Sequence, residues 1–483
     1  MKIMKKFMLI SGSLVFAAGM MHCGNNGNTG GANDMAMTPP DLTVLPGLTV
    51  SAIAPEVGVN NMPTSLAITG TGFLSGATVT VGGQPCTNPI VVAATSITCT
   101  VPAKAATCGP QNVVVANIDQ QSATSSKPFT YRSSSLAFGA ALNLTTQDAN
   151  NVVAVDLNKD GYLDLVNTNR GANNVFVFLN NKMGGFSAGT AFSTGANPIG
   201  IAAGDLDGDG KQDIVTANLG SNNFSVLLGD GNGGLKAKTD IPLAGLSQPH
   251  GIGIVDVNKD GKSDVVVTLY GSGVVAVRLG DGMGGFGGTQ PANIPVGGQP
   301  VFIAFGDING DGNLDFAVPC NSGNVVSIRT GDGTGAFTGN TNLAVTFAQQ
   351  ASIADFNGDG KLDVAATAYG SGTLMLFPGN GNGTFGAAKT TVSGGTNTIG
   401  LAAKDVDLDG ATDVTIACNN QGAAAVLRGS GTGTFTTSAG SPFVTGGQSF
   451  GLEVADLNND GLPDIVTGNS AAKTVSVLFQ TCK

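Results

Sequence analysis

Aspartates at a fixed spacing are the residues of this 483-residue chain whose types and positions could do chemistry. The pattern D-x-[D/N]-x-D-G-x-x-D occurs seven times, and its first aspartate recurs at intervals of 48 to 51 residues. Positions one, three, five and nine offer hard oxygen ligands, position seven adds a backbone carbonyl, and the glycine at six allows a sharp turn. No glutamate stands at position twelve, so the ninth aspartate is the expected bidentate ligand. The pattern predicts one calcium loop in each repeat.

The seven loops share one donor pattern, in which position seven contributes only its main-chain carbonyl. The predicted ligands are Asp156, Asn158, Asp160, Tyr162 and Asp164; Asp205, Asp207, Asp209, Lys211 and Asp213; Asp256, Asn258, Asp260, Lys262 and Asp264; Asp307, Asn309, Asp311, Asn313 and Asp315; Asp355, Asn357, Asp359, Lys361 and Asp363; Asp405, Asp407, Asp409, Ala411 and Asp413; and Asp456, Asn458, Asp460, Leu462 and Asp464. A metal-free Asp-Gly turn explains one such loop but not seven with complete ligand sets. Converging carboxylates repel one another without a counter-ion, so we expect about seven bound Ca²⁺ ions.

The composition excludes several other kinds of site. Acidic residues outnumber basic ones by 33 to 22 and the net charge is −11, which argues against a nucleic-acid partner because phosphate binding needs Lys and Arg. His22 and His250 are the only histidines, so a zinc site built from histidine or a His-dependent hydrolase has almost no material. No nucleophile elbow, P-loop or dinucleotide fingerprint is present.

Short strands are the elements that must position the loops. Glycine occupies 74 positions and charged residues make up only 11 %, a composition that excludes long helices and favours strands joined by tight turns. Each repeat reads as a strand, the acidic loop, a second strand, a Gly/Asn turn, a third strand, a Gly-rich turn and a variable fourth strand. We therefore predict an all-β chain in which residues 132–483 form a seven-bladed β-propeller.

The last repeat ends where its fourth strand should begin, at residues 479–483. Residues 138–146, which precede the first loop, match the fourth strand expected at residues 385–393 in their Phe-Gly-Ala-Ala start. We therefore predict that this early strand pairs with residues 474–479 and completes the last sheet. Such a closure hides two strand edges that would otherwise be open to aggregation.

The repeats resemble the FG-GAP/VCBS family, which forms the propellers of integrin α-subunits and occurs in many bacterial surface proteins. The resemblance rests on motifs such as Asn-Gly-Asp-Gly-Lys-Leu-Asp at residues 357–363 and Phe-Gly-Ala-Ala at residues 385–388, and it covers essentially all of residues 134–483. It implies Ca²⁺ in the seven loops and a binding or adhesive role, and it does not identify the ligand.

Residues 48–131 contain short apolar strands about ten residues apart, which predict a small immunoglobulin-like β-sandwich. The segment resembles an IPT/TIG domain in Gly-Thr-Gly-Phe at residues 70–73, Val-Gly-Gly at 81–83, Ile-Thr-Cys-Thr-Val-Pro at 97–102 and Phe-Thr-Tyr at 129–131. Such domains act as spacers or adhesive modules, so the resemblance implies a stalk or a second contact surface.

Residues 1–23 have the features of an export signal. Lysines among the first six residues precede an apolar run at residues 7–21, which has the length of a signal-peptide core and is too short to span a bilayer. Cys23, followed by a polar linker at residues 24–47, resembles a bacterial lipoprotein signal. This implies lipidation of Cys23 and an outer-membrane or cell-surface location through a lipid anchor only. The alternative is cleavage after the Ala-Ala-Gly at residues 17–19 and a secreted protein.

Six cysteines remain beyond the predicted lipidation site, and an exported chain should oxidise those that meet. Cys86 and Cys99 flank one hairpin-like excursion of the sandwich and are the predicted disulfide. The pairing of Cys108 and Cys482 stays open.

A second set of polar side chains gathers at the strand ends opposite the acidic loops. Its members are Gln147, Asn197, Gln248, Gln299, Gln349, Asn397 and Gln448 before the first strands, Asn169, Arg170, Asn218, Tyr270, Asn321, Tyr369, Asn419 and Asn469 after the second strands, and His250. Such an amide-rich ring could recognise a polysaccharide or a peptide backbone. The alternative is that these are turn residues selected for left-handed backbone geometry and local hydrogen bonds.

These features together predict a calcium-binding cell-surface protein without enzymatic activity, which mediates adhesion or recognition of a polysaccharide or protein. One alternative is a secreted hydrolase or lyase acting on polysaccharide or lipid, which would need an acid/base pair away from the loops. The acids outside the loops are few, and Asp230, Asp281 and Asp332 occupy equivalent Gly-Asp-Gly turns where local geometry explains them. The other alternative is a structural spacer of the cell envelope.

Overall fold

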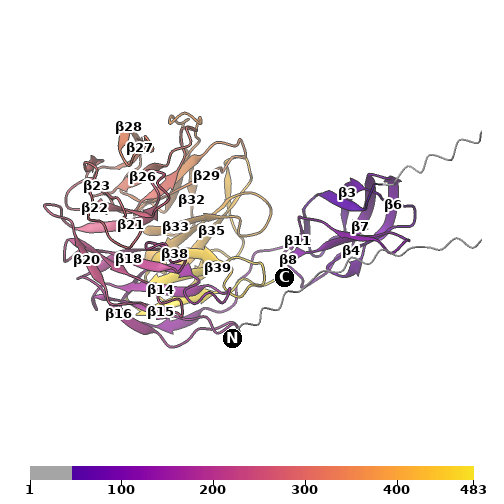
Figure 1. The fold of residues 1–483 in the computed structure, drawn as a ribbon, viewed down its shortest axis with the longest axis horizontal. Coiled ribbons are helices and arrows are strands. Elements are labelled where there is room, and N and C mark those ends of the chain that lie inside the picture. The colour runs from indigo at the N-terminus through magenta and orange to yellow at the C-terminus, as the bar shows by residue number, and fades with distance from the viewer. Residues whose placement is uncertain (1–45) are drawn as a thin grey trace, which may run out of the picture. The chain divides into compact units, whose positions relative to one another are not determined.

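A computed structural model describes residues 46–483 (Figure 1). The predicted signal at residues 1–23 with Cys23, and all but the last two residues of the predicted linker at 24–47, lie outside the described residues. The described part is built of β-strands and contains one short 3₁₀ turn, η1 at Asn419–Gln421, so the predicted all-β class is confirmed. None of its elements is a helix long and apolar enough to cross a membrane.

Residues 49–132 form a sandwich of short strands around one apolar core. Its strands are β1 (Thr49–Ala54), β2 (Val57–Val59), β3 (Thr64–Thr71), β4 (Thr78–Val81), β5 (Gln84–Pro85), β6 (Thr87–Ala93), β7 (Ser96–Val101), β8 (Gly109–Gln111), β9 (Val113–Ala116), β10 (Ser122–Thr124) and β11 (Phe129–Arg132). They pair as β1-β3-β7-β6, β10-β9-β4-β5 and β2-β11-β8. Alternate side chains of β7 and β11 point inward, and Phe129 and Tyr131 contact edge to face in the core.

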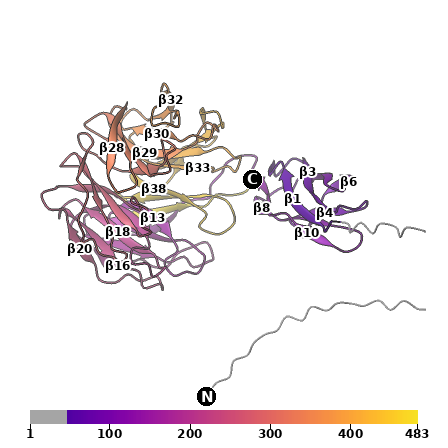
Figure 2. The same ribbon diagram turned by 45° about the horizontal axis from the view of Figure 1, so that its top comes forward.

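Residues 142–478 form seven antiparallel sheets, six of which follow the chain order (Figures 1 and 2). The strands are β13 (Ala149–Val155), β14 (Asp164–Asn169), β15 (Asn174–Phe178) and β16 (Thr190–Ser193); β17 (Pro198–Gly204), β18 (Asp213–Asn218), β19 (Asn223–Leu227) and β20 (Thr239–Pro242); β21 (Pro249–Val255), β22 (Asp264–Leu269), β23 (Val274–Arg278) and β24 (Ile294–Pro295); β25 (Ala304–Gly306), β26 (Asp315–Cys320), β27 (Val325–Gly331) and β28 (Phe337–Ala344); β29 (Ala348–Ala354), β30 (Asp363–Ala368), β31 (Thr373–Phe377) and β32 (Lys389–Val392); and β33 (Thr398–Lys404), β34 (Asp413–Cys418), β35 (Ala423–Gly429) and β36 (Phe435–Thr437), with β37 (Phe443–Val444) also on β35. The seventh sheet contains β38 (Ser449–Ala455), β39 (Asp464–Asn469) and β40 (Thr474–Leu478).

Burial within each sheet follows the strand order. All six residues of every second strand are buried, because that strand lies between two others and its side chains pack on both faces against neighbouring sheets. Outer strands such as β32 are mostly exposed and polar. Each second strand starts at the ninth aspartate of its loop, so the loops lie at one end of the most buried strands.

The seventh sheet takes its fourth strand from the start of the repeat region, as predicted. β12 (Leu142–Thr145) pairs antiparallel with β40, with Leu142 opposite Val477 and Thr145 opposite Thr474. The first strands of neighbouring sheets also pack against one another, and β38 of the last sheet packs against β13 of the first. The yellow strands β38 and β39 accordingly lie beside the magenta strands of the first sheet (Figure 1).

The cysteine pairing differs from the sequence prediction. Cys86 and Cys99 are buried free thiols in the sandwich core, so the predicted disulfide between them is wrong for this structure. The disulfide joins Cys108, before β8, to Cys482, after β40, with their Cα atoms 5.7 Å apart. These two residues are separated by 374 positions, and only the return of the chain to its starting sheet brings the C-terminus next to Cys108.

Candidate metal loops and ligand pocket

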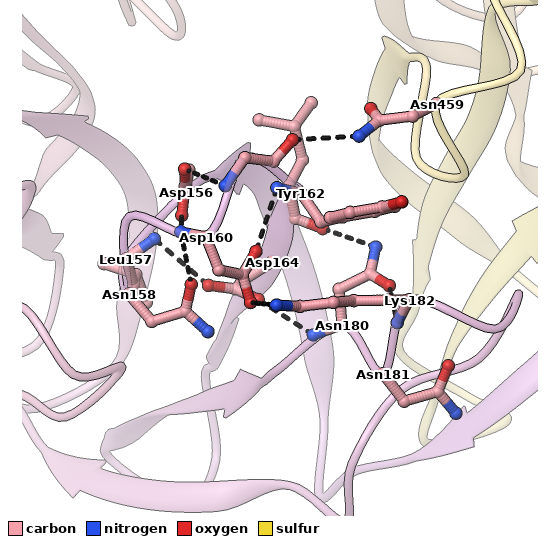
Figure 3. Close-up of polar contacts among 12 residues, drawn as sticks. Asp156, Leu157, Asn158, Asp160, Tyr162, Asp164, Asn180, Asn181, Lys182 and Asn459 are labelled. Atoms are coloured by element: carbon pink, nitrogen blue, oxygen red, sulfur yellow. Dashed lines mark hydrogen bonds and ion pairs between the residues drawn. The ribbon is translucent and has the colours of Figure 1, made fainter.

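The ninth aspartate of each acidic loop is a buried structural anchor. In the first loop, Asp164 Oδ2 accepts the backbone N–H of Leu157 at 3.1 Å, and Oδ1 accepts that of Asn180 at 2.8 Å (Figure 3). The same two bonds, from inside the loop and from the end of the third strand or just beyond it, recur in the other six loops at 2.7 to 3.0 Å. Among the described residues Asp164 accepts only these two N–H groups, whereas a third N–H group is accepted by its equivalents in the fourth, fifth and sixth loops, Asp315, Asp363 and Asp413.

The aspartates at the first and fifth positions hold the loop in its turn by accepting backbone N–H groups. Asp156 accepts the N–H groups of Asp160 and Gly161 through its two oxygens, at 3.1 and 2.9 Å, and Asp160 accepts the N–H of Tyr162 at 2.9 Å (Figure 3). The sixth-position glycine has a positive φ in all seven loops, for example +85° at Gly161, as the sharp turn requires. The seventh side chain varies freely among the loops, which agrees with a role for its main chain alone.

Negative charge accumulates in these loops. Burial, with smaller contributions from neighbouring loop carboxylates, raises the pKa of Asp164 to about 6 and those of Asp413 and Asp464 to about 7. In the second and sixth loops, three carboxylates each place an oxygen within 4.8 Å of the others: Asp205, Asp207 and Asp209, and Asp405, Asp407 and Asp409. Converging carboxylate, amide and main-chain oxygens are the donors that Ca²⁺ prefers, so the loops without a guanidinium group beside their third position fit this ion.

Basic side chains contact three of the loops. Lys182 lies 3.2 Å from the fifth-position Asp160 in the first loop (Figure 3), and Lys211 lies 2.6 Å from Asp209 in the second. In the sixth loop Arg428 contacts Asp407 at the third position. The two lysine pairs are partly exposed, and such pairs contribute little stability.

A pocket of about 480 Å³ lies at the strand ends opposite the loops. Chain order fixes this placement, because the lining residues lie at or just before the start of the first strands or just after the second strands, whereas the loops join the other ends of these strands. Its walls are Arg170, Ile199, Leu219, Gln248, His250, Tyr270, Val301, Asn321, Gln349, Tyr369, Ile399 and Phe450. The side chains come from all seven sheets, so the pocket is a property of the whole repeat domain.

The pocket walls occupy two equivalent positions of successive repeats. One position is the residue directly after the second strand, which is Arg170, Leu219, Tyr270, Asn321 or Tyr369. The other position lies at or just before the start of the first strand, where the residue is Ile199, His250, Val301, Gln349, Ile399 or Phe450. The aspartates at loop positions one, five and nine recur in every repeat, but these wall positions carry charged, aromatic, amide and aliphatic side chains. Equivalent scaffold positions that carry such varied side chains give an asymmetric surface, which a specific ligand site requires.

His250 is the titratable wall residue with a clear electrostatic signature. Its ring stacks on Tyr270 with centroids 5.7 Å apart and meets Phe302 edge-on at 5.1 Å. Burial, aided by the charge of Arg170, lowers the pKa of His250 to about 4, and its Nδ1 has no hydrogen-bond partner in the described residues. The imidazole of His250 is therefore neutral at physiological pH, and its unpartnered Nδ1 is buried.

The structure divides most of the predicted amide-rich ring into three overlapping groups. Arg170, Gln248, Tyr270, Asn321, Gln349, Tyr369 and His250 line the pocket. Asn197, Gln248, Gln299 and Asn397 adopt left-handed φ angles of 51° to 57°, so for them the turn interpretation is correct, and Gln248 serves both purposes. Asn169, Asn218, Asn419 and Asn469 are buried and hydrogen-bond within their own sheets or to the next one.

The apolar walls were not identified from the sequence. Ile199, Val301, Ile399 and Phe450 each follow a predicted ring amide by two residues. This fixed offset from the amides could have identified the apolar wall residues. It was missed because apolar residues at the start of a strand usually belong to a core.

Comparisons with known proteins agree with this architecture. A family model described as FG-GAP-like repeat matches residues 156–216, 205–267, 256–318, 355–416 and 405–467, together more than half of the chain, and an IPT/TIG domain model matches residues 48–131. Both resemblances noted in the sequence are thereby confirmed. A search of curated proteins gave no match.

Solved structures with similar folds have little sequence identity to this chain. BBS1N, crystallised in complex with ARL6DN, is 12 % identical with a TM-score of 0.51 over 73 % of this chain and 98 % of that one. A protein from Lactobacillus plantarum is 13 % identical with a TM-score of 0.51 over 71 % and 96 %. An auxiliary nutrient binding protein from Bacteroides ovatus is 12 % identical with a TM-score of 0.40 over 90 % and 98 %. The first two likenesses show the fold alone.

Proposed function

Because the chain belongs to the FG-GAP-like repeat family and carries an IPT/TIG domain, we propose that it is a non-enzymatic calcium-binding recognition protein. Its seven sheets are the blades of a closed β-propeller, a proposal supported by the β12–β40 pairing and by the contact of β38 with β13. The acidic loops hold Ca²⁺ through the side chains at positions one, three, five and nine, and the ions offset carboxylate repulsion that the fold alone leaves uncompensated.

The ligand pocket is the recognition surface. The observation that carries this proposal is the variation of its wall positions among repeats that are otherwise alike. Tyrosines and apolar groups offer flat surfaces for sugar rings or side chains, and Gln248, Asn321 and Gln349 offer paired donors and acceptors. We therefore assign a polysaccharide or a protein segment as the ligand.

Binding without catalysis agrees with the chemistry of the walls. None of the described residues that line the pocket carries a carboxylate, so His250 has no acidic partner there for acid/base work. The site is therefore suited to holding a ligand by shape and hydrogen bonds.

A cell-surface location completes the proposal. The Cys108–Cys482 disulfide supports an exported protein, because such bonds persist in oxidising compartments. The apolar segment and Cys23 support export with a lipid anchor, in which the IPT/TIG domain is the spacer that carries the recognition domain. Its membrane contact is the anchor alone.

A glycan array and a pull-down from cell-surface extract, both with the full chain in Ca²⁺, test the recognition proposal. Replacing Tyr270 and Tyr369 together with Ala should weaken binding of the best ligand at least about tenfold, since aromatic anchors contribute roughly 1 kcal/mol or more each. Tyr162→Ala is the matched control, because this tyrosine lies at the loop end and should leave binding unchanged.

Two outcomes would contradict the assignment. Binding that survives the tyrosine pair but is lost in a fully folded Asp209→Ala variant would make the loop end the functional surface. The absence of any ligand in both assays would favour the envelope spacer.

A further inference from the structure

The sixth repeat carries a charge where the other six have none. Arg428 stands in β35 directly before Gly429, whose N–H binds the ninth aspartate Asp413. The residues in the same place, each before the equivalent N–H donor, are Leu179, Leu228, Leu279, Thr330, Pro378 and Phe479. The repeats therefore provide an internal comparison in which one member differs by a guanidinium group.

That guanidinium group lies inside the acidic loop. Arg428 Nη2 contacts Asp407 Oδ2 and is 3.9 Å from Asp409 Oδ2. A second guanidinium, from Arg132 at the end of β11, has its Nη1 4.0 Å from Asp407 Oδ2. Asp407 is only 5 % exposed, so its carboxylate is removed from water and paired with two cationic side chains.

The lysines of the first two loops do not play this part. Lys182 and Lys211 reach the fifth-position carboxylates of Asp160 and Asp209. The side chains of these two aspartates are 18 % and 30 % exposed, against 5 % for Asp407. Asp207, the third-position residue of the second loop, forms no ion pair within the described residues. A cation entering loop two can displace an exposed lysine tip, because such pairs are worth little.

The two guanidinium groups make loop six less favourable for a metal ion than the other loops. A Ca²⁺ ion bound through Asp407 would lie within a few ångströms of two guanidinium groups that cannot lose their protons. It would have to displace Arg428 from the buried carboxylate of Asp407 before gaining this ligand.

We propose that loop six is closed by Arg428 in place of a metal ion, so that the chain binds six Ca²⁺ ions and not seven. This inference rests on the proposed calcium binding of the other loops. It also gives Arg132, the last residue of the IPT/TIG domain's final strand, a fixed partner in the repeat domain.

Native mass spectrometry of the full chain equilibrated with Ca²⁺ counts the bound ions. We expect six in the wild type and seven in Arg428→Leu, which installs the residue that the first three repeats carry. A matched pair of variants at the exposed fifth position makes the test independent of Arg428. Asp209→Ala in loop two should lower the count to five, and Asp409→Ala in loop six should leave it at six.

Seven ions in the wild type, with one lost in Asp409→Ala, would overturn the inference and leave the calcium proposal intact. A count of six that does not rise in Arg428→Leu would also overturn it, provided that this variant melts as a folded protein. Zero ions in every variant would contradict the calcium proposal and this inference together. If Arg428→Leu does not fold, the Asp209 and Asp409 pair decides.

Discussion

Single aspartates connect the strands of each sheet to the acidic loop. Asp164 and its six equivalents bind one N–H inside the loop and one at the end of the third strand or just beyond it, so they fix where the loop meets the sheet. The sequence assigned these residues to metal binding alone. Their structural role could not be predicted, because it depends on the main-chain N–H of a residue sixteen positions later. A main-chain donor leaves no signal in the amino-acid sequence.

Glu453 gives a residue-level prediction away from the loops. It lies on β38 beside a small central cavity with Asn151 and Gln350, and burial, opposed by the charge of Lys404, raises its pKa to about 7. Because this folded-state pKa exceeds the ordinary value of about 4.3, the protonated acid stabilises the fold at low pH, and that stability is lost as pH rises through 7.

The stability of Glu453→Gln relative to the wild type should therefore be higher at pH 8 than at pH 5, by roughly 1–3 kcal/mol. Denaturant unfolding at both pH values in saturating Ca²⁺ measures the difference. An equal difference at pH 5 and pH 8 would show that the carboxyl group is not the cause.

At the scale of elements, the closing strand is the feature with the clearest consequence. The buried Leu144 of β12 packs in one cluster with Leu165, Val466 and Val475, whereas Thr145 beside it is exposed. Leu144→Asp should therefore separate β12 from β40 and lower the hydrogen-exchange protection of β40 and then β39, since a charge cannot remain in that cluster. Thr145→Asp is the control and should leave protection unchanged. Uniform loss over all sheets in Leu144→Asp would contradict the closure of a single sheet by β12.

The elements themselves were largely predictable, and the turns were not. Strand order and the β12 closure follow from comparing repeats, because the same sequence pattern appears once at the start where it is missing at the end. The turn amides were ambiguous because Asn and Gln both adopt left-handed φ angles and bind ligands, as Gln248 does. Which of these amides line the pocket depends on how all seven sheets pack together, and the sequence of a single repeat does not contain this information.

At the scale of the whole molecule, two features join distant parts of the chain. The Cys108–Cys482 disulfide and the Arg132–Asp407 contact both link the sandwich to the repeat domain. Neither could be predicted from spacing, because the partners are far apart in sequence and meet only in the folded chain. The sequence-based choice of Cys86 and Cys99 relied on nearness along the chain, and these thiols pack instead as part of the sandwich core.

We propose that bound calcium holds the repeat domain together. At millimolar Ca²⁺ and an affinity of ~10⁻⁴ M, each site adds roughly 1.4 kcal/mol, and six sites add on the order of 8 kcal/mol. That is comparable to the net stability of a whole domain. Thermal melting of the full chain in millimolar Ca²⁺ and again in excess EDTA tests this directly. We predict a midpoint lower by ten degrees or more in EDTA, on the order expected from that loss, and a return to the first value when Ca²⁺ is restored. An unchanged midpoint would contradict the account.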